Sequence, residues 1–368
     1  MRFYPIIISL LFSCYSGNSQ RVDTLRKYLD NSLAFTNKNK AVYPAVAIQT
    51  GDHWYLFAVY PDTGTLLKAY FKDRELKIKD GPLTLYYPNN IKAMECRYIN
   101  NVQQGVWKYY YKNGQLKDSG IIKNNQMVNT WYSWYPNGQI MAVMEYLPPD
   151  SIADNHFSFA IPQQGKTGML EKDTLINHPH GQWLGYYENG MKKDSGNYVH
   201  NLREGEWINW YANGNTESKG KYKEGKQEGE WSYSYENGQA STREQYRNNK
   251  VVAMECFDEA GKSTGIFCSI LKPPVALLDR FTDFNTYMLD HIFWPKELDG
   301  KEVNGIVKAQ YTISKEGKMV AFTILETPHE LLGKETERFF RSLEKWSPGV
   351  SHNRPIDLTV TIEVPFYR

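Results

Sequence analysis

The sequence has few cysteines, no long apolar run and almost no net charge. Only four of the 368 residues are cysteine, at positions 14, 96, 256 and 268, which excludes a disulfide-dense scaffold. Cys256 and Cys268 are the closest pair in sequence. They can form a disulfide or remain two free thiols, and the sequence does not decide between these alternatives. Lys and Arg number 43 against 41 Asp and Glu, so no electrostatic feature suggests a nucleic-acid partner. No stretch approaches the roughly 18 uninterrupted apolar residues of a membrane-spanning helix.

Motifs of the common catalytic sites are also missing. Gly-x-Ser-x-Gly, the phosphate-binding Walker loop and Cys-x-x-Cys do not occur in the chain. His178-Pro179-His180 is the only tight histidine pair, and the lack of a neighbouring cysteine or acidic cluster disfavours a metal site there. Asp and Glu are scattered, which leaves a glycosidase-like carboxylate pair open. We therefore expect a non-catalytic protein without a metal ion or other cofactor.

Residues 1–19 have the pattern of an export signal. Arg2 precedes the apolar run Ile6 to Phe12, and small residues follow up to Ser19, after which a signal peptidase would cut. Leu11-Phe12-Ser13-Cys14 is also a loose lipoprotein motif, so acylation of Cys14 is the alternative to cleavage after Ser19. Either outcome predicts export, and the only membrane contact expected of the mature chain is a lipid anchor.

A repeat fills the middle of the sequence. Gly-x-Trp, followed six residues after the Trp by Asn-Gly, recurs with a period of 24 residues, with starts at 81, 105, 129, 181, 205 and 229 in more or less complete form. The step from 129 to 181 is one period plus 28 residues, which predicts an insertion near 148–180. A fixed period of this size indicates a repeat array.

Each period reads as one antiparallel β-hairpin. Asn-Gly predicts a type I′ turn, and a second turn signal such as Asn100-Asn101 falls half a period away. Two turns in one period leave two strands of ordinary length. In the first strand, the Trp and the residue four positions later share a face, which predicts an aromatic ladder made of Trp107, Trp131, Trp183, Trp207 and Trp231 with Tyr111, Tyr135, Tyr187, Tyr211 and Tyr235.

These residues resemble the MORN-type repeat, in the bacterial variant whose members are often labelled antitoxin-like. The resemblance covers about residues 51–262 and implies an extended, single-layer run of β-hairpins that contacts proteins or membranes. It implies no chemistry. Residues 20–50 precede it as a lead-in, in which Leu25, Leu29 and Leu33 have the i, i+4 spacing of a short amphipathic helix over 22–35.

The pattern changes after Lys262. Residues 263–290 read as a linker around Lys272-Pro273-Pro274. Alternating apolar residues then predict strands from Val307 to Ile313, around Phe322, and from Ile356 to Phe366. Leu332, Thr336, Phe339, Phe340 and Leu343 have helical spacing. The predicted order of elements is β-β-α-β.

Residues 291–368 are similar to the TonB C-terminal domain, through Gly305-Ile306-Val307, Gly317-Lys318-Met319-Val320, Trp346-Ser347-Pro348-Gly349 and Val364-Pro365-Phe366. In that family the domain binds a segment of an outer-membrane transporter by adding a strand to its sheet edge. The resemblance implies that the last strand, Asp357 to Val364, is such an edge, with Asp357, Thr359, Thr361 and Glu363 facing a partner. The chain departs from TonB because it shows no spanning anchor and no long Pro-rich spacer, so energy transduction is not expected.

The sequence thus predicts a mainly β protein: a single-layer array of hairpin repeats followed by a small α+β domain. We expect a non-catalytic interaction protein, exported to the periplasm or associated with the outer membrane of a Gram-negative cell. Its partner would be an envelope protein or an outer-membrane receptor segment, with a link to TonB-type transport. The alternative is an extracytoplasmic carbohydrate-binding protein that uses the aromatic ladder, because aromatic strips on sheets bind sugars in some proteins.

Overall fold

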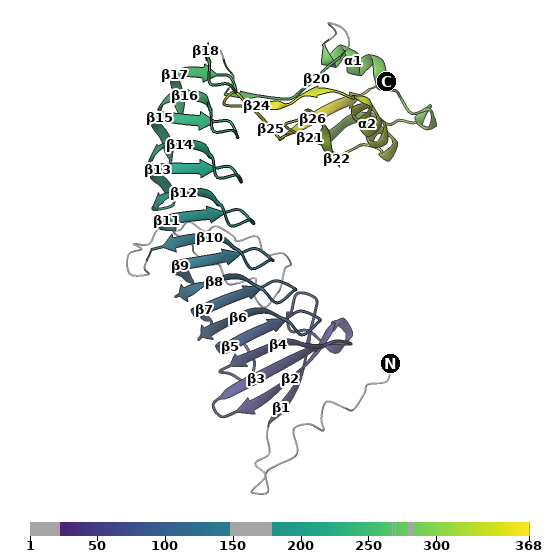
Figure 1. The fold of residues 1–368 in the computed structure, drawn as a ribbon. Helices are drawn as coiled ribbons and strands as arrows, with labels where there is room; N and C mark the ends of the chain where they lie inside the picture. The colour runs from purple at the N-terminus through teal and green to yellow at the C-terminus, as the bar shows by residue number, and fades with distance from the viewer. Residues whose placement is uncertain (1–22, 148–178, 267, 269, 279–282, 368) are drawn as a thin grey trace. The chain divides into compact units, whose positions relative to one another are not determined.

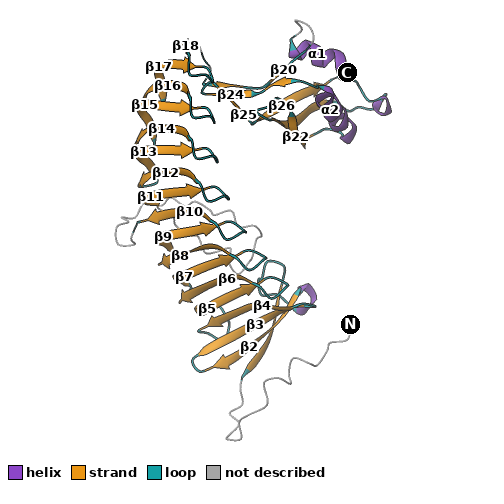
Figure 2. Ribbon diagram, in the orientation of Figure 1, coloured by secondary structure: helices purple, strands orange, loops and turns teal. Residues whose placement is uncertain are grey.

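The structure is a computed structural model that describes residues 23–147, 179–266, 268, 270–278 and 283–367. The chain divides into two compact units, Met1–Gly190 and Met191–Arg368, which are described separately. Strands dominate both (Figure 2). The predicted class is confirmed, because antiparallel hairpins make up most of the chain and a small α+β domain follows them.

The first unit is one antiparallel meander in which each strand pairs with the next along the chain (Figure 1). Its elements are β1 (Thr24–Leu29), η2 (Lys38–Lys40), β2 (Tyr43–Thr50), β3 (His53–Tyr60), β4 (Gly64–Phe71), β5 (Lys79–Tyr86), β6 (Lys92–Ile99), β7 (Val102–Tyr110), β8 (Leu116–Lys123), β9 (Gln126–Trp134), β10 (Ile140–Tyr146) and β11 (Pro179–Tyr186). The predicted insertion, residues 148–178, lies outside the described residues.

The N-terminal helix prediction is wrong. Residues 24–29 form β1, which pairs with β2 along its whole length, and Leu33 takes a positive φ of 60° that ends any helical path. Leu25 and Leu29 do share a face, with Leu29 fully buried. The spacing i, i+4 places two side chains on one face of a strand as well as on one face of a helix. The choice between them depends on a pairing partner that local spacing does not show.

The turn type predicted for Asn-Gly is wrong. At Asn113-Gly114 only the glycine has a positive φ, 88°, and Tyr111 pairs with Gln115 around a three-residue loop. That is a type I turn closed by a left-handed glycine, and not type I′. Asn100 and Asn101, in the opposite turn, take φ values of 48° and 67°, which is the type I′ signature. Loop length therefore decides the turn type.

The tryptophans of the repeats pack against glycines. A Cβ built on Gly220 would lie 2.1 Å from the ring of Trp231, and Gly120 and Gly196 meet Trp131 and Trp207 in the same way. Each indole thus packs directly on the backbone of the preceding strand, at a glycine that has no side chain. The indole of Trp231 also donates to the carbonyl of Lys221 at 3.1 Å. The packing on Gly220 and this hydrogen bond together fix the Trp231 ring. The tryptophan of the repeat therefore has a structural role.

Two hydrogen-bond ladders join successive hairpins. The hydroxyl of Tyr111 donates to the carbonyl of Trp134 at 2.8 Å, and the amide of Asn113 donates to the carbonyl of Pro136 at 2.8 Å. Both bonds span one repeat. Equivalent Tyr bonds are made by Tyr87, Tyr135, Tyr211 and Tyr235. The tyrosine four residues after the tryptophan therefore holds neighbouring repeats in register.

The second unit contains the remaining repeats and the C-terminal domain. Its elements are β12 (Lys192–Val199), β13 (Leu202–Trp210), β14 (Thr216–Lys223), β15 (Lys226–Ser234), β16 (Ala240–Arg247), β17 (Lys250–Phe257), β18 (Ser263–Gly265), β19 (Leu271–Lys272), β20 (Val275–Ala276), α1 (Phe284–His291), η4 (Lys296–Leu298), β21 (Gly305–Ile313), β22 (Met319–Glu326), α2 (Glu330–Ser342), β23 (Trp346–Ser347), β24 (Gly349–Ser351), β25 (Arg354–Ile356) and β26 (Leu358–Phe366). Strands β12 to β18 pair in chain order.

The C-terminal domain has the predicted β-β-α-β order in β21, β22, α2 and β26. Its core includes Val307, Phe339, Phe340 and Val364, all fully buried. The stretch 263–290, read as a linker, instead contains paired strands and most of α1. Strand β20 pairs with β23 and β19 pairs with β24. These partners lie between about 70 and 80 residues away in sequence, so no local pattern marks them.

Candidate partner-binding edge and its attachment to the repeats

Strand β26 forms one edge of the three-stranded sheet β22-β21-β26. Among the described strands it pairs with β21 alone, over nine residues and without a bulge. Its apolar side chains face the core, with Val364 fully buried and Phe366 5 % exposed. The alternate side chains are exposed. The sequence pattern thus gave the correct facing of this strand.

The register shows which backbone groups of β26 point away from β21. Pro365 has no N–H, so its pair with Ile306 is not a hydrogen-bonded one. Thr359 and Thr312 face each other with their hydroxyls 2.8 Å apart, as expected for the closer, non-hydrogen-bonded pairs of an antiparallel ladder. Pairs of the two kinds alternate along the ladder, so Thr361 and Glu363 also form non-hydrogen-bonded pairs with β21. The N–H and C=O groups of Thr359, Thr361 and Glu363 are therefore directed to the open side of the edge.

Three of the four predicted partner-binding residues thus lie together on one open edge. Asp357 is the exception, because the strand begins at Leu358. Its carboxylate accepts the backbone N–H of Lys315 at 2.7 Å and closes the turn between β21 and β22. We therefore assign Asp357 a structural role.

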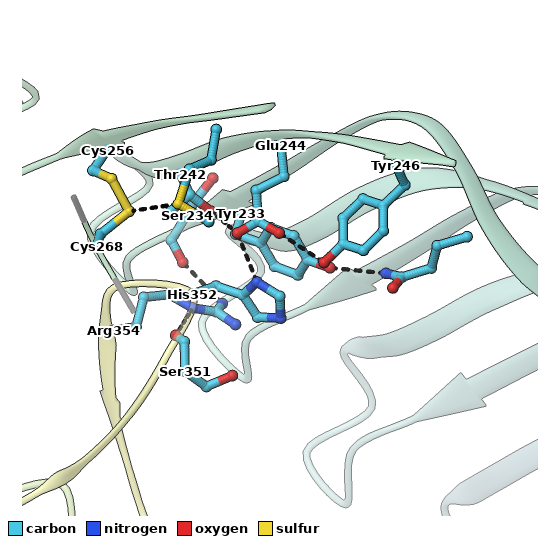
Figure 3. Close-up of polar contacts among 12 residues, drawn as sticks. Tyr233, Ser234, Thr242, Glu244, Tyr246, Cys256, Cys268, Ser351, His352 and Arg354 are labelled. Carbon is cyan, nitrogen blue, oxygen red and sulfur yellow. Dashed lines mark hydrogen bonds and ion pairs between the residues drawn. A yellow bond between two sulfur atoms is a disulfide. The ribbon is translucent and has the colours of Figure 1, made fainter. Parts of the chain in front are cut away.

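The hairpin β24–β25 ties the C-terminal domain to the last repeats. Its two turn residues, His352 and Asn353, take φ values of 48° and 62°, the type I′ geometry. The imidazole of His352 lies 2.8 Å from a carboxylate oxygen of Glu244 on β16 (Figure 3). The amide of Asn353 donates to the carbonyl of Phe257 at 2.9 Å. The turn thus contacts two neighbouring strands of the repeat sheet.

Glu244 is a buried carboxylate with a full set of partners. It is 1 % exposed, and its oxygens accept bonds from Thr242 at 2.7 Å and Tyr246 at 2.7 Å besides the contact with His352. Burial alone would raise the pKa of Glu244, but the hydrogen bonds from His352, Tyr246 and Thr242 outweigh it, so the pKa lies below its usual range. A buried carboxylate persists only with such partners.

Arg354 provides the second attachment point. Arg354 is 6 % exposed, and its guanidinium donates to the hydroxyl of Tyr211 at 2.9 Å and to the carbonyls of Glu217 and Ser234 at 3.1 Å each. A carboxylate oxygen of Glu217 lies 3.4 Å away. Tyr211 belongs to the predicted aromatic ladder. The hairpin β24–β25 therefore contacts the repeats at a residue of that ladder.

A cleft of about 600 Å³ opens beside Arg354 and includes Tyr235, Glu236 and Lys315 in its walls. Its two cationic groups are already engaged, since Lys315 pairs with Glu236 at 2.6 Å and Arg354 is bonded as described. The cleft is therefore part of the attachment between the domain and the repeats.

The predicted aromatic ladder is mostly interior. Trp107, Trp131, Trp207 and Trp231 are between 2 % and 5 % exposed, and Trp183 is half-buried. The hydroxyls of Tyr111, Tyr135, Tyr211 and Tyr235 donate the inter-repeat hydrogen bonds. A sugar ring cannot stack on indole faces that are already covered, so these four tryptophans do not form the carbohydrate surface proposed from sequence.

Several predicted features lie outside the described residues, namely the signal segment with Cys14 and the first residue of His178-Pro179-His180. His180 itself lies on β11. Across the described ranges, no three His, Cys, Asp or Glu side chains come together as a metal site requires. No helix in those ranges is long and apolar enough to cross a bilayer. Cys256 and Cys268 form a disulfide, which resolves the alternative left open by the sequence.

Comparison with protein families matches both parts of the chain. Residues 290–367 match the Gram-negative bacterial TonB protein C-terminal. Residues 103–124, 127–147, 179–200 and 203–224 match the MORN repeat variant. Comparison with curated proteins gives no match. Both resemblances drawn from the sequence are thereby confirmed.

The two families are of non-enzymatic kinds, and together they fit a protein of the Gram-negative cell envelope with a TonB-like domain. A periplasmic location is consistent with that domain. A protein partner is plausible, since TonB C-terminal domains interact with envelope or outer-membrane proteins. The sequence did not predict the hairpin β24–β25 or the residues of the repeats that it contacts. His352-Asn353 is the signal that could have indicated this hairpin, because both residues take positive φ values, as His200 and Asn201 do in a turn of the repeats.

Proposed function

We propose that this chain is a non-catalytic adaptor of the cell envelope. The repeats serve as a scaffold, and the TonB-like domain captures an extended segment of a partner protein by strand addition at β26. The observation that carries the proposal is the open edge of β26, where the backbone groups of Thr359, Thr361 and Glu363 are directed away from β21. Added strands gain affinity from main-chain hydrogen bonds and specificity from alternate side chains.

The partner we propose is the periplasm-facing segment of an outer-membrane receptor, which would link the chain to TonB-type transport. The exposed face of β26 carries Thr359, Thr361 and Glu363, and Lys308 on β21 faces Glu363 with 4.0 Å between charged atoms. A polar, mixed-charge surface of this kind suits a hydrophilic strand, since an apolar one would leave these groups unpaired.

Thr361→Pro tests the proposal. Proline removes the outward N–H of residue 361 but none of the N–H groups that bond to β21. We expect it to abolish capture of synthetic peptides that cover the periplasm-facing segments of outer-membrane receptors from the same cell. Thr361→Ala keeps the N–H and should retain capture. The edge is wrong as a binding site if Thr361→Pro binds as well as the wild type while its circular dichroism and thermal unfolding are unchanged.

A further inference from the structure

The sheet face opposite the tryptophans carries an aromatic row in the first unit. We define this outer row as the residue three positions after each tryptophan position, which is Tyr86 on β5, Tyr110 on β7, Trp134 on β9 and Tyr186 on β11. Side chains alternate along a strand, so these rings point away from the buried face. All four are partly exposed, and none belongs to the buried core of the unit.

The contacts of the outer row confirm its side of the sheet. The hydroxyl of Tyr110 donates to Glu95 at 2.6 Å, and Lys68 lies 5.4 Å from the centre of the Tyr86 ring. Trp134 stacks on Tyr132, which is 40 % exposed, with ring centres 5.9 Å apart. Each of these neighbours alternates with a buried residue of its own strand.

The fold does not require aromatic residues at these places. In the second unit the same repeat position is Trp210 in β13 but Ser234 in β15. A neighbouring cross-strand pair on the same face is apolar in the first unit and charged in the second. It is Val106 with Ile121 in the first unit, 54 % and 39 % exposed, but Glu206 with Lys221 in the second. Exposed apolar groups where a sister repeat carries charges indicate contact with another molecule.

The charges beside Tyr86 and Tyr110 are mainly positive, whereas Glu145 lies on the same face between the strands of Trp134 and Tyr186. Register places Lys68, Thr84, Glu95 and Lys108 in one cross-strand line on this face, and Lys92 faces Tyr86. Glu95, the single carboxylate among these five side chains, is already held by Lys92 at 2.6 Å and by Tyr110. Lys68 lies over the Tyr86 ring and Lys108 faces Glu95 across the strands, so both ammonium groups lie beside the row, where they can pair with a ligand of negative charge.

We propose that the outer row binds a linear, equatorially β-1,4-linked polysaccharide that carries carboxylates. Aromatic faces suit the flat C–H faces of such hexoses, and the lysines would pair with the carboxylates. Successive rings of the row lie two strands apart, which is about 9.5 Å for antiparallel strands. That distance is close to the length of one disaccharide unit of an extended β-1,4 chain, so one ring can stack on every second sugar.

Calorimetric titration with a β-1,4-mannuronate hexasaccharide tests the site. We expect saturable binding that weakens by roughly tenfold in Trp134→Ser and in Tyr110→Ser, because each change removes one stacking contact. Serine is chosen because Ser234 occupies the equivalent position in β15, so the fold tolerates it. Lys68→Gln with Lys108→Gln should weaken mannuronate binding but leave binding of neutral cellohexaose unchanged. Mannuronate binding should also weaken with added salt.

Phe293→Ala is the matched control, since Phe293 is an exposed aromatic of the C-terminal domain with the Arg338 guanidinium over its ring at 5.2 Å. It should bind like the wild type. The proposal is overturned if mannuronate does not bind, if Trp134→Ser binds normally, or if α-1,6-linked dextran binds equally well. Equal affinity for mannuronate and cellohexaose would overturn the carboxylate preference. Peptide capture at β26 is a separate assay, so the two proposals fail independently.

Discussion

The imidazole of His352 lies flat on the phenol ring of Tyr233, with ring centres 3.6 Å apart and planes 6° apart. The two residues come from the TonB-like domain and from the last repeats. Tyr233 shares the buried face with Trp231, and burial raises its pKa to about 12. The repeat sheet therefore provides an aromatic platform for the turn of the hairpin β24–β25.

Arg354→Ala should weaken this attachment. The change removes a buried guanidinium and its hydrogen bonds to the Tyr211 hydroxyl and to the carbonyls of Glu217 and Ser234, of which the Ser234 carbonyl keeps the Tyr211 hydroxyl as a donor. We expect the free energy of unfolding to fall by roughly 2–4 kcal/mol, measured by urea denaturation. Arg341→Ala is the control, because Arg341 forms an exposed helix pair with Glu337 and should change stability by about 0.5 kcal/mol or less. Equal effects of the two changes would contradict the assignment.

Acid should destabilise the chain through Glu244. Its pKa in the folded protein lies below the ordinary value of 4.5, so the unfolded state binds the proton more readily. The stabilisation is therefore present above pH 4.5 and is lost as the pH falls through the folded-state pKa. We expect the wild type to lose more unfolding free energy between neutral pH and pH 3.5 than Glu244→Gln does. Parallel losses in urea titrations of the two proteins would refute this role.

Gly220→Ala should be strongly destabilising. The added methyl would lie 2.1 Å from the ring of Trp231, so the indole or the backbone must shift. Overpacking of this kind costs about 1–3 kcal/mol or more, visible as a lower melting temperature. Lys219→Ala, one residue earlier on the same strand, removes only an exposed pair with Glu206 and should have little effect. A tolerated Gly220→Ala would show that the tryptophan can relocate.

Loss of the Cys256–Cys268 disulfide should lower stability by roughly 2–3 kcal/mol, the value for closing a loop of this size. The bond joins β17 to the segment that continues to Ile270, whose carbonyl accepts the N–H of His352 at 2.9 Å. Cys268→Ser measured without reductant should match the wild type measured with dithiothreitol. A variant as stable as the oxidised wild type would mean that the crosslink does not constrain the unfolded chain.

Tyr111→Phe tests the inter-repeat bonds. It removes the hydroxyl that donates to the carbonyl of Trp134 at 2.8 Å and leaves that carbonyl without this donor. We expect a loss of about 1 kcal/mol in unfolding free energy. Tyr132→Phe, at a residue 40 % exposed, is the matched control and should be neutral. If both changes are neutral, the tyrosine ladder does not hold the repeats together.

Much of this fold could be predicted from local spacing, because the repeats recur at a fixed interval and side chains alternate between the two faces of each strand. The period of 24 residues predicted the hairpins, and the alternation from Leu358 to Phe366 predicted both the strand and its buried side. The same reasoning failed at Leu25 and Leu29, where the spacing suits a strand and a helix alike. It also failed at Asn113-Gly114, where loop length overrode the dipeptide preference.

The sequence by itself determined the repeat, the two families and the exposed face of β26, because each depends on residues close together in the chain. Only the tertiary structure decided which aromatic residues are reachable. The tryptophans are covered because glycines one strand away admit their rings, whereas Tyr110 and Trp134 remain on the open face. The attachment of Arg354 to Tyr211 likewise joins residues far apart in sequence, and contacts of that range depend on how the chain folds back on itself.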